Sequence, residues 1–513
     1  MKRRTLIFGS GKYSVKIAKS LIKNGFDVLI TENRENLISD EFYSFSESDS
    51  IKFITNAKII SANGFVGNFE VIFKVNDVVT VERADNIIIS EEYLIKPDFN
   101  NLTPSETVIP LFDFKAKIDN LSESFLQNKK IAFLTGLNGE GTAHSLKNIL
   151  EFCSKLHAKA NLKTFVFTKN LKVGAEGLEK LYRKTKDAGT LYFKFTNSEP
   201  KISNIDESDE SKVLIEFFDE ITDQNFKLIP DITIVDCNFF PSPYLKEIAR
   251  NFELSLDENG FIQADNVHRL PVFTNRKGIF VVGSSRSIQS DDENILDADN
   301  AIGESIALFN DFNQGPFFKA DINYNRCARC LTCYRNCPYR TIIFDKKVIV
   351  IKEACYGCGI CASLCPSLAI KLKNNDGDIK SKELIQFDSD GIHVFCCERS
   401  ALKAYKMVIS SGLNLPLRLK ILEVPCAGSI SINNILTCFE NNASGVLILT
   451  CHEGNCHSEK GNIYAKNRVG FLKKQLQDMG INKERLLLKT IASNMVFEFN
   501  DIVNNFAKKL SLL

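Results

Sequence analysis

The densest group of reactive side chains in this sequence is a run of four cysteines within eleven residues, followed directly by a proline. The same C-x2-C-x2-C-x3-C-P spacing occurs a second time shortly after the first. Thiolates at this density are typical ligands of iron–sulfur clusters, whereas a zinc site, the alternative, usually joins two C-x2-C pairs across a longer spacer. The two runs are Cys327, Cys330, Cys333 and Cys337, and Cys355, Cys358, Cys361 and Cys365.

This tandem resembles the bacterial two-cluster ferredoxin, over about residues 320–372. In that pattern the fourth cysteine of each run ligates the other cluster, because the proline carries it into a following turn. We therefore predict two [4Fe–4S] clusters with crossed ligands. The first cluster takes Cys327, Cys330, Cys333 and Cys365, and the second takes Cys355, Cys358, Cys361 and Cys337.

The residues around the first run are unusually basic for a ferredoxin. This is either a solvated face or a surface that docks on acidic groups of a partner or of the same chain. The segment of residues 204–223 is acidic enough to be that surface. The alternative is that it forms an exposed loop and helix with no docking role. The cations are Arg326, Arg329, Arg335, Arg340, Lys346 and Lys347, opposed only by Asp321 and Asp345.

The N-terminal segment has a dinucleotide-binding pattern of strand, glycine turn, amphipathic helix and strand. Gly9 permits the tight turn, Gly11 lets a pyrophosphate approach the helix N-terminus, and Glu32 ends the second strand, where it can accept from a ribose hydroxyl. Ser14 holds the third glycine position. The alternative is a Rossmann-like unit that binds nothing.

A second α/β stretch and a closing motif follow. The glycines after residue 135 are not followed by a lysine, which excludes a nucleoside triphosphatase loop. A strand that ends in Gly283 and a helix that begins near Asp299 resemble the closing motif of two-dinucleotide-domain flavoproteins, although Ser284 replaces the usual acidic residue. We predict FAD, held by Gly9, Gly11, Ser14, Glu32 and Gly283.

The last part of the chain alternates strands and helices, which predicts a doubly wound parallel sheet. Its first three strands end in cysteine, at the sheet edge where such folds bind ligands. Cys396 faces the other side of its strand and is a reserve ligand, His452 and His457 are alternative ligands, and buried structural cysteines are the alternative to a site. The predicted [2Fe–2S] ligands are Cys397, Cys426, Cys451 and Cys456.

Composition and charge are those of an ordinary globular chain. Lys and Arg number 64, Asp and Glu 63, so no nucleic-acid partner is indicated. No apolar run reaches the ~18 to 20 residues of a membrane span, and we expect a cytoplasmic protein. Sixteen cysteines in a reducing compartment favour metal binding over disulfides.

Residues 450–486 resemble the iron–sulfur delta subunit of methanogen-type hydrogenases. Residues 54–73, the Gly283 strand and the ferredoxin repeat resemble the A-type subunit of heterodisulfide reductase. Together they resemble the B-type subunit family of quinone-interacting membrane-bound oxidoreductase complexes. This implies an electron-transfer subunit, with a flavoprotein A-type subunit, a quinone-reactive membrane subunit and adenylylsulfate reductase as partners. Ser400 replaces a family cysteine, which puts the last cluster in doubt.

Two other functions stay open from the sequence. One is a heterodisulfide-reductase-type subunit coupled to a hydrogenase or formate dehydrogenase, and the other is a relay or scaffold with an empty flavin fold. The expected fold class is α/β. The expected parts are a FAD-binding Rossmann-like domain (1–125 and 241–315), an inserted second α/β domain (126–240), a two-cluster ferredoxin domain (316–375), a linker (376–390) and a C-terminal iron–sulfur domain (391–513).

Overall fold

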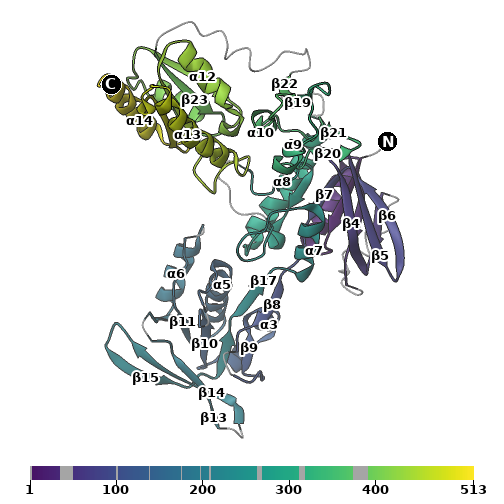
Figure 1. Cartoon of the computed structure of the whole chain (residues 1–513). Helices are drawn as coiled ribbons and strands as arrows, with labels where there is room; N and C mark the ends of the chain where they lie inside the picture. The colour runs from purple at the N-terminus through teal and green to yellow at the C-terminus, as the bar shows by residue number, and fades with distance from the viewer. Residues whose placement is uncertain are drawn as a thin grey trace.

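The structure, a computed structural model, has two α/β units, a small ferredoxin module and a C-terminal α/β domain (Figure 1). The predicted linker, residues 376–390, lies outside the described residues. Those described are 3–34, 50–99, 102–137, 139–174, 176–196, 198–206, 209–262, 269–310, 318–373 and 391–513. No helix among them is long and apolar enough to cross a bilayer.

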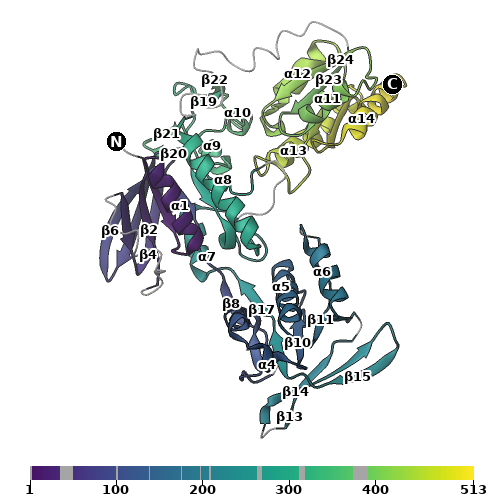
Figure 2. The same cartoon turned by 180° about the vertical axis from the view of Figure 1, so that it is seen from behind.

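The first unit is a parallel five-stranded sheet in the order β18-β7-β1-β2-β3. Helices α1 and α8 lie side by side on one face (Figure 2), and α7 and an antiparallel sheet of β4, β5 and β6 cover the other. Its elements are β1 (Arg4–Phe8), α1 (Lys12–Lys23), β2 (Asp27–Thr31), β3 (Ile51–Ile54), β4 (Ala57–Phe65), β5 (Asn68–Val75), β6 (Val78–Ala84), β7 (Asn86–Ile89), α7 (Pro243–Phe252), β18 (Ile279–Val281) and α8 (Asp291–Asn310).

Helix α8 begins earlier than predicted, at Asp291 instead of near Asp299. The reason is a reciprocal cap: the Glu293 backbone N–H donates to Ser290 Oγ, and the Ser290 backbone N–H donates to the Glu293 carboxylate. Three acidic residues in the first turn also favour an early start.

The second unit is a parallel sheet in the order β12-β11-β10-β16-β9, joined to the first by the antiparallel pair β8–β17. Because β9 belongs to this sheet, the unit begins by Val108, and the predicted boundary at residue 126 is wrong. Its elements are β8 (Leu94–Pro97), β9 (Val108–Pro110), α3 (Leu111–Lys117), α4 (Glu123–Leu126), β10 (Lys130–Thr135), α5 (Ala143–Lys159), β11 (Lys163–Thr168), α6 (Leu178–Asp187), β12 (Leu191–Lys194), β16 (Ile232–Val235) and β17 (Cys237–Phe240).

The acidic segment of residues 204–223 lies mainly in an antiparallel sheet of β13 (Lys201–Asp206), β14 (Asp209–Asp219) and β15 (Gln224–Leu228), so the predicted loop and helix are wrong. Apolar residues alternate along β14, and Val213 and Ile215 are buried, which is the two-residue period of a strand. This sheet lies at the opposite end of the molecule from the ferredoxin module (Figures 1 and 2), so the two do not dock within one chain.

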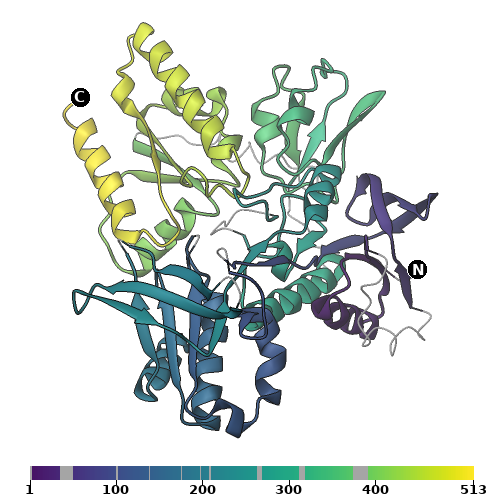
Figure 3. The ribbon, with the colours of Figure 1, turned by 90° about the horizontal axis from the view of Figure 1, so that it is seen from below.

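The ferredoxin module has two antiparallel strand pairs, β19–β22 and β20–β21, with one short helix after each cysteine loop. It neighbours the C-terminal domain (Figures 1 and 3). Its elements are β19 (Lys319–Ile322), α9 (Thr332–Asn336), β20 (Ile342–Asp345), β21 (Lys347–Val350), α10 (Ile360–Ser363) and β22 (Ile370–Lys373).

The C-terminal domain is the predicted doubly wound parallel sheet, in the order β24-β23-β25-β26. Helices α12 and α13 pack on one face, and α11 and α14 pack on the other. Its elements are β23 (Gly391–Cys397), α11 (Ala401–Ser410), β24 (Leu419–Val424), α12 (Ile432–Glu440), β25 (Ala443–Thr450), α13 (Gly461–Asp478), β26 (Leu486–Thr490) and α14 (Val496–Leu510).

Candidate functional site

The first ferredoxin cavity is lined by the four cysteines predicted for the first cluster, Cys327, Cys330, Cys333 and Cys365. Apolar side chains close the rest of its wall, including Ile322, Leu331 and Val348. Burial and the three neighbouring thiols raise the pKa of Cys333. Four sulfur donors around one cavity fit a cluster, and a bound metal would stabilise the thiolate of Cys333, which burial makes costly to ionise.

The second cavity is lined by Cys337, Cys355, Cys358 and Cys361. Cys337 therefore lies with the second run of cysteines, and Cys365 lies with the first, as the crossed pattern predicts. Backbone N–H groups donate to ligand sulfurs in both cavities: Gly357 to Cys355 at 3.4 Å, and Ala369 to Cys365 at 3.3 Å. Such bonds orient the ligands and stabilise negative charge on sulfur.

The C-terminal sheet brings its four predicted cysteines together in one buried group at the carboxyl ends of its strands. Cys397 ends β23, Cys451 follows β25, Cys426 follows β24, and Cys456 returns from the loop after β25. Cys397 Sγ and Cys451 Sγ are 3.7 Å apart. A tetrahedral metal with metal–sulfur bonds of about 2.3 Å holds two thiolates about 3.8 Å apart, so this pair suits one metal.

The sulfurs of this group share hydrogen bonds. Hydrogen bonds with Cys426 and Cys451 lower the pKa of Cys456. The bond with Cys456 raises the pKa of Cys426, and the bonds with Cys397 and then Cys456 raise the pKa of Cys451. The pKa of Cys397 is lowered to about 7, chiefly by its hydrogen bond with Cys451, in which either sulfur can be the donor. The Ser400 hydroxyl is buried and makes no hydrogen bond among the described residues.

The alternative ligands lie elsewhere. Cys396 packs in the core on the opposite face of β23, as strand alternation predicts. His452 Nε2 contacts Met495 Sδ at 3.5 Å, and His457 Nδ1 pairs with the Tyr339 hydroxyl at 2.9 Å. In the described part of the chain, no three His, Cys, Asp or Glu side chains converge on one mononuclear metal position.

Gly461, the first residue of α13, borders the C-terminal thiols. A Cβ at this position would lie 2.3 Å from Cys426 Sγ and 3.4 Å from Cys456 Sγ. Only glycine leaves the sulfurs room here. No motif in the sequence marks this residue.

The second cavity and the C-terminal thiols adjoin one another through Cys358. This cysteine lines the cavity and also packs against the buried group of Cys397, Cys426, Cys451 and Cys456. The close approach depends on glycine: a Cβ on Gly359, where φ is +78°, would lie 2.5 Å from Ser429 Cβ.

Hydrogen bonds hold the two domains together around this contact. Tyr464 donates from its hydroxyl to Asn336 Oδ1 at 2.7 Å, and Ser363 donates to the Gly428 carbonyl at 2.6 Å. Arg468 donates to Ser363 Oγ at 2.8 Å and to the Gly428 carbonyl at 3.0 Å. Sequence reasoning missed these residues, since nothing local links positions this far apart.

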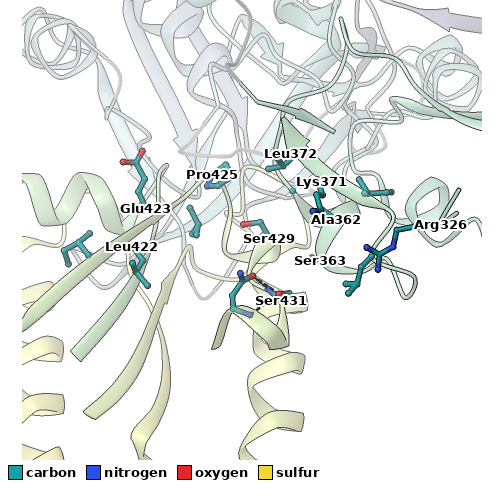
Figure 4. A pocket seen from close by; sticks show the side chains of 16 residues that line it. Arg326, Ala362, Ser363, Lys371, Leu372, Leu422, Glu423, Pro425, Ser429 and Ser431 are labelled. Atoms are coloured by element: carbon teal, nitrogen blue, oxygen red, sulfur yellow. Dashed lines mark hydrogen bonds between the residues drawn. The ribbon is translucent and has the colours of Figure 1, made fainter. Parts of the chain in front are cut away.

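A groove separates the two domains beside this contact (Figure 4). It lies between β22 and α10 on one side and β24 with the turn after it on the other. Arg326, Lys371 and Glu423 give it charged margins, and Leu372 and Leu422 contribute apolar walls. Nothing in the groove is a metal ligand of the predicted sets.

The dinucleotide residues meet at the carboxyl edge of the first sheet. Gly9 has a φ of +98° and packs on the Ser90 carbonyl, Gly11 caps α1, and Ser14 is buried in the first turn of that helix. The Glu92 carboxylate lies against the open side of Gly11. The backbone has the form of a dinucleotide cradle, and Glu92 is the flexible side chain that must move before a pyrophosphate can reach Gly11.

Glu32 is fully buried at the end of β2 and already has two partners. It accepts from Ser10 Oγ at 2.7 Å and from Arg34 Nε at 2.9 Å. Burial, and then the charge of Glu32, raise the pKa of nearby Glu91 to about 7. The edge therefore carries several carboxyl groups. Below neutral pH, Glu91 is mostly protonated and adds little negative charge to this edge.

Gly283 lies in a turn after β18, with a φ of +57°. Its backbone N–H donates to Asp297 Oδ2 at 3.1 Å, and Arg286 Nε donates to the same oxygen at 2.9 Å. The α1 and α8 N-termini are linked by Tyr13, whose hydroxyl donates to Asp291 Oδ1 at 2.7 Å. These contacts bring both halves of the predicted flavin site to one edge, where the role of each residue stays a prediction.

Two family models match the chain. Residues 392–513 match the family described as methyl-viologen-reducing hydrogenase, delta subunit, and residues 348–371 match the 4Fe–4S binding domain. The D-type iron–sulfur subunit of an F420-non-reducing hydrogenase from Archaeoglobus profundus is 32% identical over 110 residues, which is 21% of this chain and 80% of that protein.

A longer match is to a heterodisulfide reductase subunit. The A-type subunit of the ferredoxin:CoB-CoM heterodisulfide reductase from Methanosarcina mazei is 21% identical over 381 residues, 70% of this chain and 47% of that protein. This chain thus spans about half the length of this heterodisulfide reductase subunit. Among solved structures, the flavoprotein disulfide reductase RclA from Escherichia coli has a TM-score of 0.38 and 14% identity, covering 58% of this chain and 69% of that one.

Proposed function

The C-terminal part of this chain belongs to the methyl-viologen-reducing hydrogenase delta subunit family, and from this premise we propose that the whole chain is an iron–sulfur electron-transfer subunit of an oxidoreductase complex. Two [4Fe–4S] clusters in the ferredoxin module and a [2Fe–2S] cluster in the C-terminal domain form one conducting path. The likeness to the A-type subunit of a heterodisulfide reductase over 70% of the chain supports this proposal.

The observation that carries the proposal is the shared position of Cys358. It lines the second ferredoxin cavity and packs against the C-terminal thiols, so the two sites share a wall. Electron tunnelling slows steeply with distance, and two sites that share a wall exchange electrons well. The two ferredoxin sites are linked through the chain, because Cys337 follows the first run and lines the second cavity, and Cys365 ends the second run and lines the first.

The residues of the chain set the properties of each site. Gly357 and Ala369 donate backbone N–H groups to cysteine sulfur, as does Gly428 to Cys426 at 3.4 Å. Hydrogen bonds to sulfur favour the reduced, more negative state of a cluster and raise its potential. Burial of the second and C-terminal sites keeps these bonds strong there.

We further propose FAD at the edge formed by Gly9, Gly11, Ser14, Glu32 and Gly283. When bound, FAD would convert between two-electron and one-electron transfer. The α1 N-terminus would face the pyrophosphate, and Glu32 would face the ribose. Glu92 would have to leave Gly11, which makes it the side chain that controls entry.

The partners in this proposal are a flavoprotein A-type subunit, a quinone-reactive membrane subunit and adenylylsulfate reductase. The chain would then lie in the cytoplasm, held at the inner face of the membrane by its partners. The alternative is a heterodisulfide-reductase-type subunit coupled to a hydrogenase or formate dehydrogenase, which the names of its relatives favour. Purification of the native complex distinguishes them, since only the first yields a quinone-reactive membrane subunit.

The path is tested by anaerobic purification of the full chain. Two [4Fe–4S] clusters and one [2Fe–2S] cluster correspond to roughly ten irons per chain. In Cys358→Ala, we expect the second cluster to be damaged and magnetic coupling to the C-terminal cluster to be lost. Cys438→Ala is the matched control, because Cys438 is buried in α12 outside all three sites. Wild-type spectra in Cys358→Ala, or a zinc-loaded chain without iron, contradict the proposal.

A further inference from the structure

Exposure differs sharply among the three cysteine sites. Cys330, in the first cavity, is exposed, and Cys327 and Cys365 of the same cavity are partly exposed. Three of the four cysteines in the second cavity are buried, and all four in the C-terminal group are buried. The first site is therefore where the path opens to solvent.

The surface around Cys330 is basic and aromatic, and we call it the basic patch. Tyr324 and Tyr334 are 50% and 44% exposed. Lys347 Nζ lies 5.1 Å above the Tyr324 ring, and Arg335 Nη2 donates to the Cys330 carbonyl at 3.0 Å. These contacts place the β20–β21 hairpin, α9 and the first cysteine loop on one surface. The basic patch consists of Tyr324, Arg329, Tyr334, Arg335, Lys346 and Lys347.

The cations of the basic patch have no carboxylate partner in the part of the chain that the structure describes. Within the described residues, none of the four pairs with an Asp or Glu, whereas nearby Asp321 pairs with Lys373 at 2.7 Å and Arg340 pairs with Glu253 at 3.1 Å. The acidic β13–β15 sheet of the same chain lies at the far end of the molecule (Figures 1 and 2). The positive charge of the basic patch is thus available to another molecule.

We propose that the basic patch docks an acidic one-electron carrier protein, so that electrons enter or leave this chain at the first cluster. This rests on the proposed function, since it requires that cluster. Arginine and tyrosine are typical of protein interfaces, and complementary charge speeds encounter and orients the partner. One electron passes between the cluster and the carrier: the donor is oxidised, the acceptor is reduced, and no bond or proton is exchanged.

The test uses the full chain with its clusters, verified by iron and sulfide content, and a plant-type [2Fe–2S] ferredoxin as the acidic probe. We expect saturable binding in calorimetry that weakens with added salt. Carbodiimide cross-links between the two proteins should map to Lys346 and Lys347. A triple charge reversal, Arg329→Glu, Lys346→Glu and Lys347→Glu, should weaken binding on the order of 10- to 100-fold.

The matched control reverses three exposed lysines on α6 of the second unit, Lys180, Lys184 and Lys186, for the same change in net charge. It should retain wild-type affinity. The proposal is overturned if the patch variant binds as tightly as wild type, if the control loses as much affinity, if the probe does not bind, or if cross-links lie elsewhere. Patch-dependent self-association, or binding to anionic lipid vesicles without binding to the probe, would also overturn it. A chain without iron would fail earlier and would refute the proposed function itself.

Discussion

Replacing Gly461 with alanine should disrupt the C-terminal cluster site while leaving the fold in place. Gly461 begins α13, and its φ is not positive, so the backbone itself tolerates a side chain. A side chain is excluded because the neighbouring sulfur atoms leave no space for it. The added Cβ would lie 2.3 Å from Cys426 Sγ and 3.4 Å from Cys456 Sγ.

The magnitude follows from these distances. An ordinary contact needs roughly 3.5 to 4 Å, so the Cys426 sulfur must move by more than about 1 Å. A metal site holds its ligand distances within about 0.2 Å, and such a shift therefore exceeds what ligation permits. The overpacking should cost about 1–3 kcal/mol, against the ~0.5–1 kcal/mol that alanine gains over glycine within a helix.

Gly470 in the same helix is the control, because it is exposed and a Cβ there meets nothing within 4 Å. Gly470→Ala should keep wild-type iron and raise stability by up to about 1 kcal/mol. After anaerobic purification, Gly461→Ala should lose about two irons and two sulfides per chain and the matching visible absorption. Wild-type iron content in Gly461→Ala would refute the assignment of this thiol group as a cluster site.

Three further predictions concern the other sites. Cys337→Ala should damage the cluster of the second run of cysteines, and spectra that lose only the first cluster would refute crossed ligation. Burial raises the pKa of Glu91 from 4.5 to about 7, so the folded state holds this proton more tightly than the unfolded state. The stabilisation that this proton provides is fully present below pH 4.5 and is lost as the pH rises to about 7. Urea denaturation should therefore show the free energy of unfolding of Glu91→Gln rising by up to roughly 3 kcal/mol relative to wild type between pH 4.5 and 8. A difference that stays constant with pH would contradict this. Gly11→Leu should empty the flavin site and Glu92→Ala should tighten FAD binding; fluorescence titration that finds FAD affinity unchanged in both would refute the cradle.

The cysteine sites could be predicted from the sequence because their chemistry is local. The two cysteine runs contain every ferredoxin ligand within 39 residues, from Cys327 to Cys365, and the spacing itself implies the crossing. The C-terminal site was predictable for a different reason. In a parallel sheet all carboxyl ends meet at one edge, so cysteines that follow successive strands must come together.

Some elements could not be predicted because contacts outweighed the local pattern. The acidic charge of residues 204–223 suggested a loop and helix, yet Val213 and Ile215 pack into the second unit and make this segment β-structure. Helix α8 starts at Asp291 because Ser290 and Glu293 cap each other. Neither charge nor glycine position alone revealed these arrangements.

Residue type and spacing along one loop or one strand end are short-range properties, so the order of residues alone indicates which cysteines should carry the proposed chemistry. Tertiary structure decided how the sites relate to one another and what surrounds them. Cys358 joins two sites, Gly461 leaves room for the Cys426 sulfur, and Glu92 covers Gly11, through contacts between residues 35 to 98 positions apart. Such contacts depend on how separately folded units pack, and side-chain packing between units has no signature in the local order of residues.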